Sequence, residues 1–496
     1  MVGGSSGPWD DPLRLDAWHI WRAGVQAVDP VGAVTRALGA LDRASPFAPT
    51  SVRGRYFVVG AGKAGALMAL AVESYLNDLG IAKERISGWV NVPAPAAVEV
   101  APRLPLGCVH LHAARPAGVN EPTPAAWKGT QEILRLVGTA GPQDLVICVL
   151  SGGGSALLPA PAHGISLEHK LRVTQLLVDC GATIEEINAV RKHISQVKGG
   201  GLARHCPHAR ILSLIVSDVI GDPLDVIASG PTAPDPTTFA QALAVLARYG
   251  LEKQVPASVL DHLHRGARGE IAETLKELPK DDRGRPRVLN LVVASNRSAV
   301  RAAAAEASRR GYQVLDLGSW IAGDTQTAAQ FLAMIALGVR QELCLGLAPT
   351  WDIDTAESQG QRSARPPDPM LAVPPPVPVA ILSGGETTVR LPPEHGLGGR
   401  NQELALAFLD YLGERIVGIT LLCGGTDGED GPTDAAGAVA DRGVFDAARA
   451  RGLVPADFLA RHDSYHFFAQ LDALVKTGLT HTNVMDLRVI LVRPVP

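Results

Sequence analysis

Short apolar runs lead into glycine-rich turns at three places in this sequence, and these turns hold the residues best suited to chemistry. The turns are Gly60-Ala-Gly-Lys-Ala-Gly65, Ser151-Gly-Gly-Gly-Ser155 and Ser383-Gly-Gly-Glu386. Glycine allows several backbone N–H groups to point at one anion, so such turns suit phosphate. A tight turn without a ligand is the alternative at each place. The candidate phosphate-binding residues are Gly62, Ser151, Gly152, Gly153, Gly154, Ser155, Gly384, Gly385 and Glu386.

The first turn matches the GxGxxG pattern of dinucleotide-binding sites, which lies between a strand and a helix. A nicotinamide site also needs an acidic residue at the end of the next strand to hold the ribose. Here that strand ends Val90-Asn-Val-Pro93, without an acid. Lys63 lies inside the turn, where its ammonium would face a bound anion. The dinucleotide match is therefore partial, and Lys63 favours a phosphate ligand.

Carboxylates follow two of the predicted strands. Asp218 comes directly after an apolar run, and Asp427 and Asp434 belong to the acid-rich stretch Gly424–Ala436. A carboxylate at a strand end can bind magnesium or accept a proton from a substrate hydroxyl. We predict all three as magnesium ligands, with Asp218 also as a catalytic residue; which acid takes which role stays open. Capping of a turn, or a solvated loop, is the alternative.

Two polar-basic segments complete the set of candidates. A helix is predicted over residues 184–205, and one of its faces carries Asn188, Arg191, Ser195 and Lys198. This face would line an anionic cleft, and a solvent-facing stripe is the alternative. The sequence Gly398-Gly-Arg-Asn-Gln-Glu403 opens a second predicted helix, where an arginine adds a guanidinium to the positive helix terminus. The predicted substrate-binding residues are Asn188, Arg191, Lys198 and Asn401.

The elements that must position these residues alternate between strands and helices. Near-continuous apolar strands between helices are typical of parallel sheets that helices cover on both faces. The chain has more such strands than one ordinary sheet holds. We therefore predict an α/β protein of two three-layer lobes, each with a mostly parallel, Rossmann-like sheet, and a cleft between the lobes. The predicted strands are Tyr56–Val59, Trp89–Val92, Leu145–Leu150, Ile211–Val216, Val288–Ala294, Val314–Leu317, Val379–Leu382, Gly418–Cys423 and Leu487–Val492.

Two breaks in the pattern suggest the domain organisation. Residues 251–287 are polar and charged and end just before a strand, so we place an N-terminal lobe at 14–260 and a C-terminal lobe at 285–496. Residues 351–378 are rich in proline and are predicted as an exposed loop or insertion.

Composition excludes several classes of protein. Lys and Arg number 46 and Asp and Glu 50, so the net charge of −4 argues against a nucleic-acid-coating protein. No apolar run approaches the length of a membrane span, and the N-terminal residues lack the apolar core of a secretory signal. The six scattered cysteines form no CxxC pair, which is typical of free thiols. We expect a cytoplasmic protein; mitochondrial import and the oligomeric state, with a homodimer as one alternative, stay open.

Taken together, seven motifs resemble the glycerate 2-kinases that carry a C-terminal MOFRL region. They occur in the family's order and cover about residues 15–492. The chain departs from the family at Leu479 and His481, where the family tends to have proline and glycine. The motifs lie at Val58–Gly65, Leu150–Ala156, Asn188–His193 with Lys198–Gly201, Ser217–Asp218 with Ser229–Thr232, Ser383–Thr387, Gly399–Glu403, and Gly425–Gly428 with Gly431–Ala435.

This resemblance implies a function. It implies ATP-dependent phosphorylation of D-glycerate to 2-phosphoglycerate with Mg²⁺, between two α/β lobes, with the MOFRL region at 378–492. It also implies that Lys63 and Arg400 are the active-site cations. Two alternatives remain: an NAD(P)-dependent hydroxypyruvate reductase, which the GxGxxG pattern favours, and a non-enzymatic sugar-phosphate-binding protein. The position of the phosphorylated hydroxyl rests on the resemblance alone.

Overall fold

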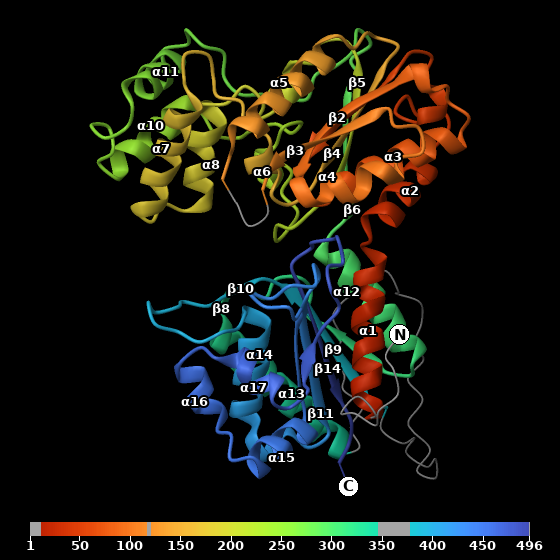
Figure 1. The fold of residues 1–496 in the computed structure, drawn as a ribbon, viewed down its shortest axis with the longest axis vertical. Coiled ribbons are helices and arrows are strands. Elements are labelled where there is room, and N and C mark those ends of the chain that lie inside the picture. Colours follow the sequence, from red (N-terminus) through yellow and green to blue (C-terminus); the bar gives the residue numbers. More distant parts are fainter. Residues whose placement is uncertain (1–10, 117–120, 346–376, 496) are drawn as a thin grey trace, which may run out of the picture. The chain divides into compact units, whose positions relative to one another are not determined.

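The computed structural model describes residues 11–116, 121–345 and 377–495. The chain divides into two compact units, coloured along the sequence in Figure 1. The N-terminal unit comprises residues 28–295 and 481–484. The C-terminal unit comprises the residues up to Ala27, residues 296–480 and residues 485–496. The predicted proline-rich loop at 351–378 lies almost wholly outside the described residues.

The N-terminal unit is built on a parallel sheet of six strands in the order β3-β2-β1-β4-β5-β6. Every neighbouring pair in it is parallel, as the apolar strands predicted. Strands β1 and β4 are buried along their whole length, because helices cover both faces. The strands are β1 (Tyr56–Ala61), β2 (Ile86–Pro93), β3 (Val109–Arg115), β4 (Leu145–Leu150), β5 (Arg210–Val216) and β6 (Val288–Ala294).

Helices α3 and α5 cover opposite faces of this sheet. The Asn91 side chain donates to Ala126 of α5, while the neighbouring Val90 and Val92 contact Gly65 of α3. Alternate residues of a strand point to opposite faces, so the unit has three layers. Helices α7, α8, α10 and α11 share a separate apolar core. The helices are α2 (Pro30–Ala40), α3 (Gly65–Asp78), α4 (Ala94–Val100), α5 (Pro124–Gly138), α6 (Gly154–Leu157), α7 (Leu167–Asp179), α8 (Ile184–His193), α9 (Gly201–Arg204), α10 (Phe239–Arg248) and α11 (Ala257–Ala267), with 3₁₀ turns at Pro49–Ser51, Lys83–Arg85, Ala101–Arg103 and Ile227–Ser229.

The C-terminal unit has a mixed sheet in the order β13-β12-β11-β14-β9-β7. Only the β7–β9 pair is parallel, so the prediction of a second mostly parallel sheet was wrong. A parallel neighbour requires a crossover connection, whereas residues 426–436 join β11 to β12 without a helix. The strands are β7 (Gln313–Asp316), β9 (Val379–Gly385), β11 (Ile419–Gly425), β12 (Gly437–Ala440), β13 (Leu474–Val475) and β14 (Asp486–Val492), and a separate small sheet pairs β8 (Gly323–Asp324) with β10 (Thr387–Thr388).

Two apolar cores lie on the two faces of the mixed sheet. Helices α1 and α12 pack on one face and α13 and α14 on the other. Helix α1 contains residues expected in the N-terminal lobe, yet it belongs to the C-terminal unit, where Arg14 forms a buried ion pair with Asp441. The helices are α1 (Pro12–Ala27), α12 (Asn296–Arg309), α13 (Thr325–Cys344), α14 (Arg400–Leu412), α15 (Arg442–Ala450), α16 (Pro455–Ala460) and α17 (Ser464–Ala469), with a 3₁₀ turn at Gly413–Ile416.

None of the helices within residues 11–116, 121–345 and 377–495 is both long and apolar enough to span a bilayer.

Candidate active site

The first two glycine-rich turns lie side by side at the carboxyl ends of β1 and β4. The Lys63 N–H donates to the Gly152 carbonyl over 2.8 Å, and the Ala64 N–H donates to Ser151 Oγ over 3.0 Å. Within the described residues, the N–H groups of Gly152, Gly153 and Ser155 donate no hydrogen bond. Free N–H donors of this kind suit the binding of an anion, which the glycine-rich sequence of the second turn predicted. The helix that follows, α6, is a single four-residue turn.

The GxGxxG glycines have a packing role. A Cβ atom at Gly60 would lie 1.9 Å from the Val149 carbonyl oxygen, and one at Gly62 would lie 2.0 Å from Ser151 Oγ. Both positions therefore require glycine because β1 approaches β4 so closely. This requirement accounts for the first two glycines without a dinucleotide.

Asp218 and Lys63 lie next to the second turn. A Cβ atom at Gly152 would lie 2.2 Å from Asp218 Oδ2, so this half-buried carboxylate sits against the turn. Burial raises the pKa of Asp218, while a backbone hydrogen bond and the charge of Lys63 oppose that rise. The Lys63 side chain is exposed. The structure thus brings together the two predicted catalytic residues of this unit.

Two predicted substrate-binding cations converge on Ser155. The Lys198 ammonium donates to Ser155 Oγ over 2.8 Å and to the Ser155 carbonyl over 2.9 Å, and Arg191 also donates to Ser155 Oγ. Ser229 joins the group through contacts with Ser155, and it donates to Asn188 Oδ1 over 3.4 Å. We call Asn188, Arg191, Lys198, Ser155 and Ser229 the Ser155 cluster.

The prediction of one helix over residues 184–205 was wrong, although Asn188, Arg191 and Lys198 do lie in one cluster. Helix α8 ends at His193, and the next residues pair with another segment: Ala162 donates to the Ile194 carbonyl and Gln196 to the Ala160 carbonyl. Lys198 therefore reaches Ser155 from a loop and not from a helix face. The start of α8 is fixed locally by a capping box between Thr183 and Glu186.

Positive charge in this region lacks a matching acid. Lys170 of α7 is 2% exposed and donates only to the Ile194 carbonyl, over 3.4 Å, and no ion pair joins Lys170, Arg191 or Lys198 to a carboxylate within the described residues. Lys192, in contrast, is paired with Asp225 and Asp235. Burial, followed by the neighbouring cations, holds the pKa of Lys198 well below its ordinary value. Buried charges without partners are unfavourable, so the region is prepared for an anion.

The turn beside the Ser155 cluster contains strained backbone. Asp222, Ala228 and Ser229 all have φ between 51° and 62°, in the left-handed region that favours glycine. Strain of this kind persists only where the surroundings enforce it, often at functional sites. Here it positions the Ser229 hydroxyl against Asn188 and Ser155.

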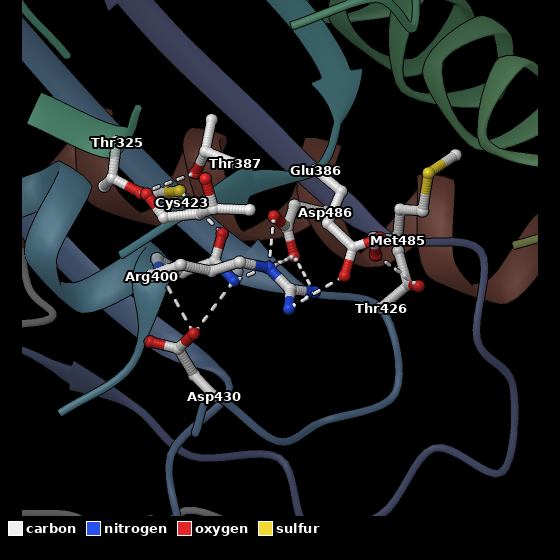
Figure 2. Close-up of polar contacts among 12 residues, drawn as sticks. Thr325, Glu386, Thr387, Arg400, Cys423, Thr426, Asp430, Met485 and Asp486 are labelled. Carbon is white, nitrogen blue, oxygen red and sulfur yellow. Dashed lines mark hydrogen bonds and ion pairs between the residues drawn. The ribbon is translucent and has the colours of Figure 1, made fainter. Parts of the chain in front are cut away.

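In the C-terminal unit, carboxylates hold Arg400 (Figure 2). Its guanidinium donates to both oxygens of the fully buried Asp486 over 2.8 to 3.1 Å, and Nη1 lies 3.0 Å from Glu386 Oε1. These acids raise the pKa of Arg400 further above its ordinary value, against the opposing effect of burial. The predicted cation is thus present at the start of α14, already paired with acids of its own unit.

Asp430 occupies the N-terminus of α14. Its carboxylate accepts from the N–H groups of Asn401 and Gln402 and from the Asn401 side chain. Burial and the neighbouring Asp486 raise the pKa of Asp430 to about 7, although these hydrogen bonds oppose the rise. Asn401, a predicted substrate-binding residue, is 1% exposed and is committed to these two acids.

The remaining predicted residues of this unit contact other partners or lie in packed positions. Asp434 binds Tyr465 and Lys476, and Asp427 Oδ1 accepts from the Glu429 N–H. A Cβ atom at Gly384 would lie 1.6 Å from Asn296 Oδ1, and one at Gly385 would lie 2.3 Å from the Ile321 carbonyl oxygen. Both glycines therefore serve the packing of β9.

The carboxylates of the described residues differ in how well they suit magnesium. No group of three or more His, Cys, Asp or Glu side chains suited to a metal occurs in the described part of the chain. Mg²⁺ characteristically binds one or two carboxylates together with substrate phosphates and water. Asp218 fits that arrangement because its carboxylate lies beside the second turn, whereas Asp434 is already engaged.

Lys170 was not predicted as a site residue, although the sequence pattern of α7 indicates that it is buried. Helix α7 buries Leu167, Lys170, Val173 and Leu176 at helical spacing, so a lysine stands on the apolar stripe. A lysine in that position is unusual enough to mark a buried charge. Asp430 and Asp486 could not be assigned as partners of α14, because they lie far from it in sequence.

Two family models match the chain. Residues 16–264 match a model described as a domain of unknown function, DUF4147, and residues 379–486 match the MOFRL family. The glycerate 2-kinase of Pyrococcus horikoshii is 34% identical over 474 residues, which are 94% of this chain and 94% of that protein. This chain belongs to the glycerate kinase family.

A solved structure and a further relative also match most of this chain. The crystal structure of a glycerate kinase from Thermotoga maritima matches with a TM-score of 0.77 at 33% identity, covering 97% of this chain and 99% of that one. A protein from Agrobacterium vitis whose name proposes a hydroxypyruvate reductase is 36% identical over 98% of this chain and 96% of its own length.

His481 is one of the positions where the sequence was expected to depart from the family. It has φ of 59°, in the left-handed region. Its Nε2 lies 3.5 Å from Glu99 Oε1 in the N-terminal unit to which both belong. The backbone at this position thus keeps a conformation that glycine adopts without strain.

Proposed function

We propose that this chain is a glycerate 2-kinase that transfers the γ-phosphoryl group of ATP to D-glycerate. The observation that carries the proposal is the Ser155 cluster, where buried cations without acidic partners meet a glycine turn with free N–H donors. Phosphoryl transfer needs positioning and charge neutralisation more than covalent chemistry, and this site supplies both.

We assign the anions as follows. The N–H groups of Gly152, Gly153 and Ser155 bind ATP phosphates, and Arg191 and Lys198 bind the glycerate carboxylate. Lys63 neutralises charge on the transferred phosphoryl group, and we propose that Arg400 acts on the same group. Bound glycerate and ATP would supply the negative charge that no carboxylate of the described residues provides to these buried cations.

Asp218 is proposed to hold Mg²⁺ or to accept the proton of the glycerate hydroxyl. Bound magnesium would supply positive charge to the phosphate oxygens. The raised pKa of Asp218 suits a proton acceptor, because proton transfer is efficient when the pKa of the base approaches the working pH. Substitution of Asp218 with Asn removes both functions and is expected to lower turnover strongly.

The test is a split assay on the purified protein. One half contains D-glycerate, ATP and Mg²⁺ and follows ADP formation; the other contains hydroxypyruvate with NADH or NADPH and follows nicotinamide oxidation. ADP that depends on glycerate, without nicotinamide oxidation, supports the kinase, and product analysis then distinguishes 2- from 3-phosphoglycerate. Nicotinamide oxidation without ADP formation would overturn the proposal.

The reductase is kept as the second candidate because the name of the Agrobacterium vitis relative proposes it. Against it, packing explains Gly60 and Gly62, and β2 ends without a ribose-binding acid. Ligand binding without turnover in either assay would favour the third alternative, a sugar-phosphate-binding protein.

A further inference from the structure

Arg115 is a buried arginine outside the predicted site. It is the last residue of β3 and is 5% exposed. Its guanidinium makes no hydrogen bond or ion pair within the described residues, and burial lowers its pKa. An arginine in such surroundings normally has an acid beside it, because an unpaired buried charge is strongly unfavourable.

The guanidinium lies against the second glycine-rich turn. A Cβ atom at Gly153 would lie 3.3 Å from Arg115 Nη2 and 3.4 Å from Lys63 Cγ. Two cationic side chains, from the ends of β1 and β3, thus approach the same glycine. Gly153 has φ of 74°, and its own N–H has no acceptor within the described residues.

The second turn therefore has cations at its middle residue and at its last residue. Arg115 and Lys63 approach Gly153, whereas Arg191 and Lys198 bind Ser155 two residues later. One loop between two separate cationic groups suits a reaction that brings two anions together. Asp218 adjoins Gly152, the residue before Gly153.

We propose that Arg115 is a further substrate-contacting residue, which binds the phosphate chain of the donor nucleotide at Gly153 together with Lys63, while the Ser155 cluster binds the acceptor carboxylate. This assignment rests on the proposed kinase function. A guanidinium binds phosphate oxygens in a two-pronged fashion, which a lysine cannot reproduce.

The test compares Arg115→Met and Arg115→Lys with wild type. Arg103→Met, at an exposed arginine of a nearby 3₁₀ turn, is the matched control for loss of one positive charge. Three quantities are measured: the unfolding temperature without ligand, the Kd for magnesium tripolyphosphate by calorimetry, and the KM values for ATP and glycerate.

The expected result separates ligand binding from structure. Arg115→Met weakens tripolyphosphate binding and raises the KM for ATP by about 10- to 100-fold, and the KM for glycerate changes less than about twofold. The unliganded variant unfolds at the wild-type temperature or above, because an uncompensated buried charge has been removed. Arg115→Lys shows a smaller loss, and Arg103→Met shows none.

Three results would overturn the assignment. A rise in the KM for glycerate alone would place Arg115 with the acceptor. Unchanged kinetics and tripolyphosphate binding would remove it from the site. An Arg115→Met variant that is less stable, or does not fold, would give Arg115 a structural role. Tripolyphosphate binding that depends on Arg115, without glycerate-dependent ADP formation, would instead contradict the kinase function and keep the phosphate subsite.

Discussion

Lys170 and Lys198 show how neighbouring like charges can set the working range of a site. Burial is the largest cause that lowers the pKa of both lysines, the charge of Arg191 lowers both further, and the charge of Lys170 also lowers the pKa of Lys198. A lysine whose pKa is depressed loses its proton at a lower pH than an exposed lysine does. We therefore expect glycerate binding through Lys198 to weaken as the pH rises through that depressed pKa.

Lys170→Met tests whether the charge of Lys170 lowers the pKa of Lys198. The change removes a like charge, so the pKa of Lys198 rises and the alkaline increase in the KM for glycerate moves to higher pH. The unfolding temperature at neutral pH should not fall, because methionine fills a similar volume without a buried charge. Steady-state kinetics from pH 6 to 10 measure the first effect and calorimetry the second.

Lys253→Met, at an exposed lysine, is the control and should leave the pH profile unchanged. An unchanged profile for Lys170→Met, or a shift to lower pH, would contradict the electrostatic coupling.

Lys63 and Arg400 allow a test of the proposed shared phosphoryl group. Lys63→Ala and Arg400→Ala should each lower kcat on the order of a hundredfold, or about 3 kcal/mol, because each removes a charge donor from the transition state. Since both are proposed to act on one group, the double variant should lose less than the product of the two single effects.

The measurement is kcat of all four proteins, with unfolding temperatures to separate loss of folding in Arg400→Ala, whose guanidinium also neutralises Asp486. Near-normal turnover in both single variants would remove these residues from catalysis, and full additivity would place them on different groups.

Residue types and spacing predicted which side chains lie together in the N-terminal unit better than they did in the C-terminal unit. Lys63, Asp218 and Ser151–Ser155 meet because parallel strands bring their carboxyl ends to one edge. Arg400 was predicted as an open clamp, yet Asp486 and Glu386 hold it. That pairing depends on strand order in a mixed sheet, which local sequence does not determine.

At the scale of elements, tertiary pairing replaced a predicted helix. Residues 194–196 have helical neighbours on both sides, but their backbone groups pair with Ala160 and Ala162. Strand β3 was not predicted because Val109–Arg115 includes histidines and an arginine among its apolar residues. Apolar runs such as Leu145–Leu150 were predicted correctly, because full burial leaves a continuous apolar signal.

Gly62→Ala tests whether the first turn is constrained by packing. The added Cβ would approach Ser151 Oγ to 2.0 Å at a φ of 149°, so we expect a loss of at least about 1 to 3 kcal/mol in the free energy of unfolding. Urea unfolding measures this loss. Gly39→Ala, at a position in α2 with no atom within 4 Å, should be neutral or slightly stabilising. Equal stabilities of the two variants would contradict the packing argument.

At the scale of the whole molecule, the two units are not consecutive halves of the chain. Helix α1 packs with α12 in the C-terminal unit, and residues 481–484 return to the N-terminal unit. The buried pair between Arg14 and Asp441 joins residues 427 positions apart. Loss of α1 should therefore affect the C-terminal unit first.

Arg14→Met tests that expectation, because it leaves Asp441 buried without its guanidinium partner, at a cost of about 3 to 5 kcal/mol. Hydrogen exchange should become faster in β11 and β14 and stay near wild type in β1 and β4. Arg43→Met, at an exposed residue after α2, is the control. Equal loss of protection in both sheets would contradict the division into units.

The path of the chain also sets an order of events during synthesis. Helix α1 is synthesised before the rest of the C-terminal unit, but its packing partners include β14, which lies between β11 and β9 in the sheet. From Ala27 to Asp486 the ribosome adds 486 − 27 = 459 residues, which takes roughly half a minute to a minute and a half. Throughout that time the apolar face of α1, with Ile20 and Trp21, lacks β14 as a packing partner, whereas the sheet of residues 56–294 can already assemble. We therefore expect the C-terminal unit to complete its fold only after β14 has been synthesised, later than the N-terminal sheet.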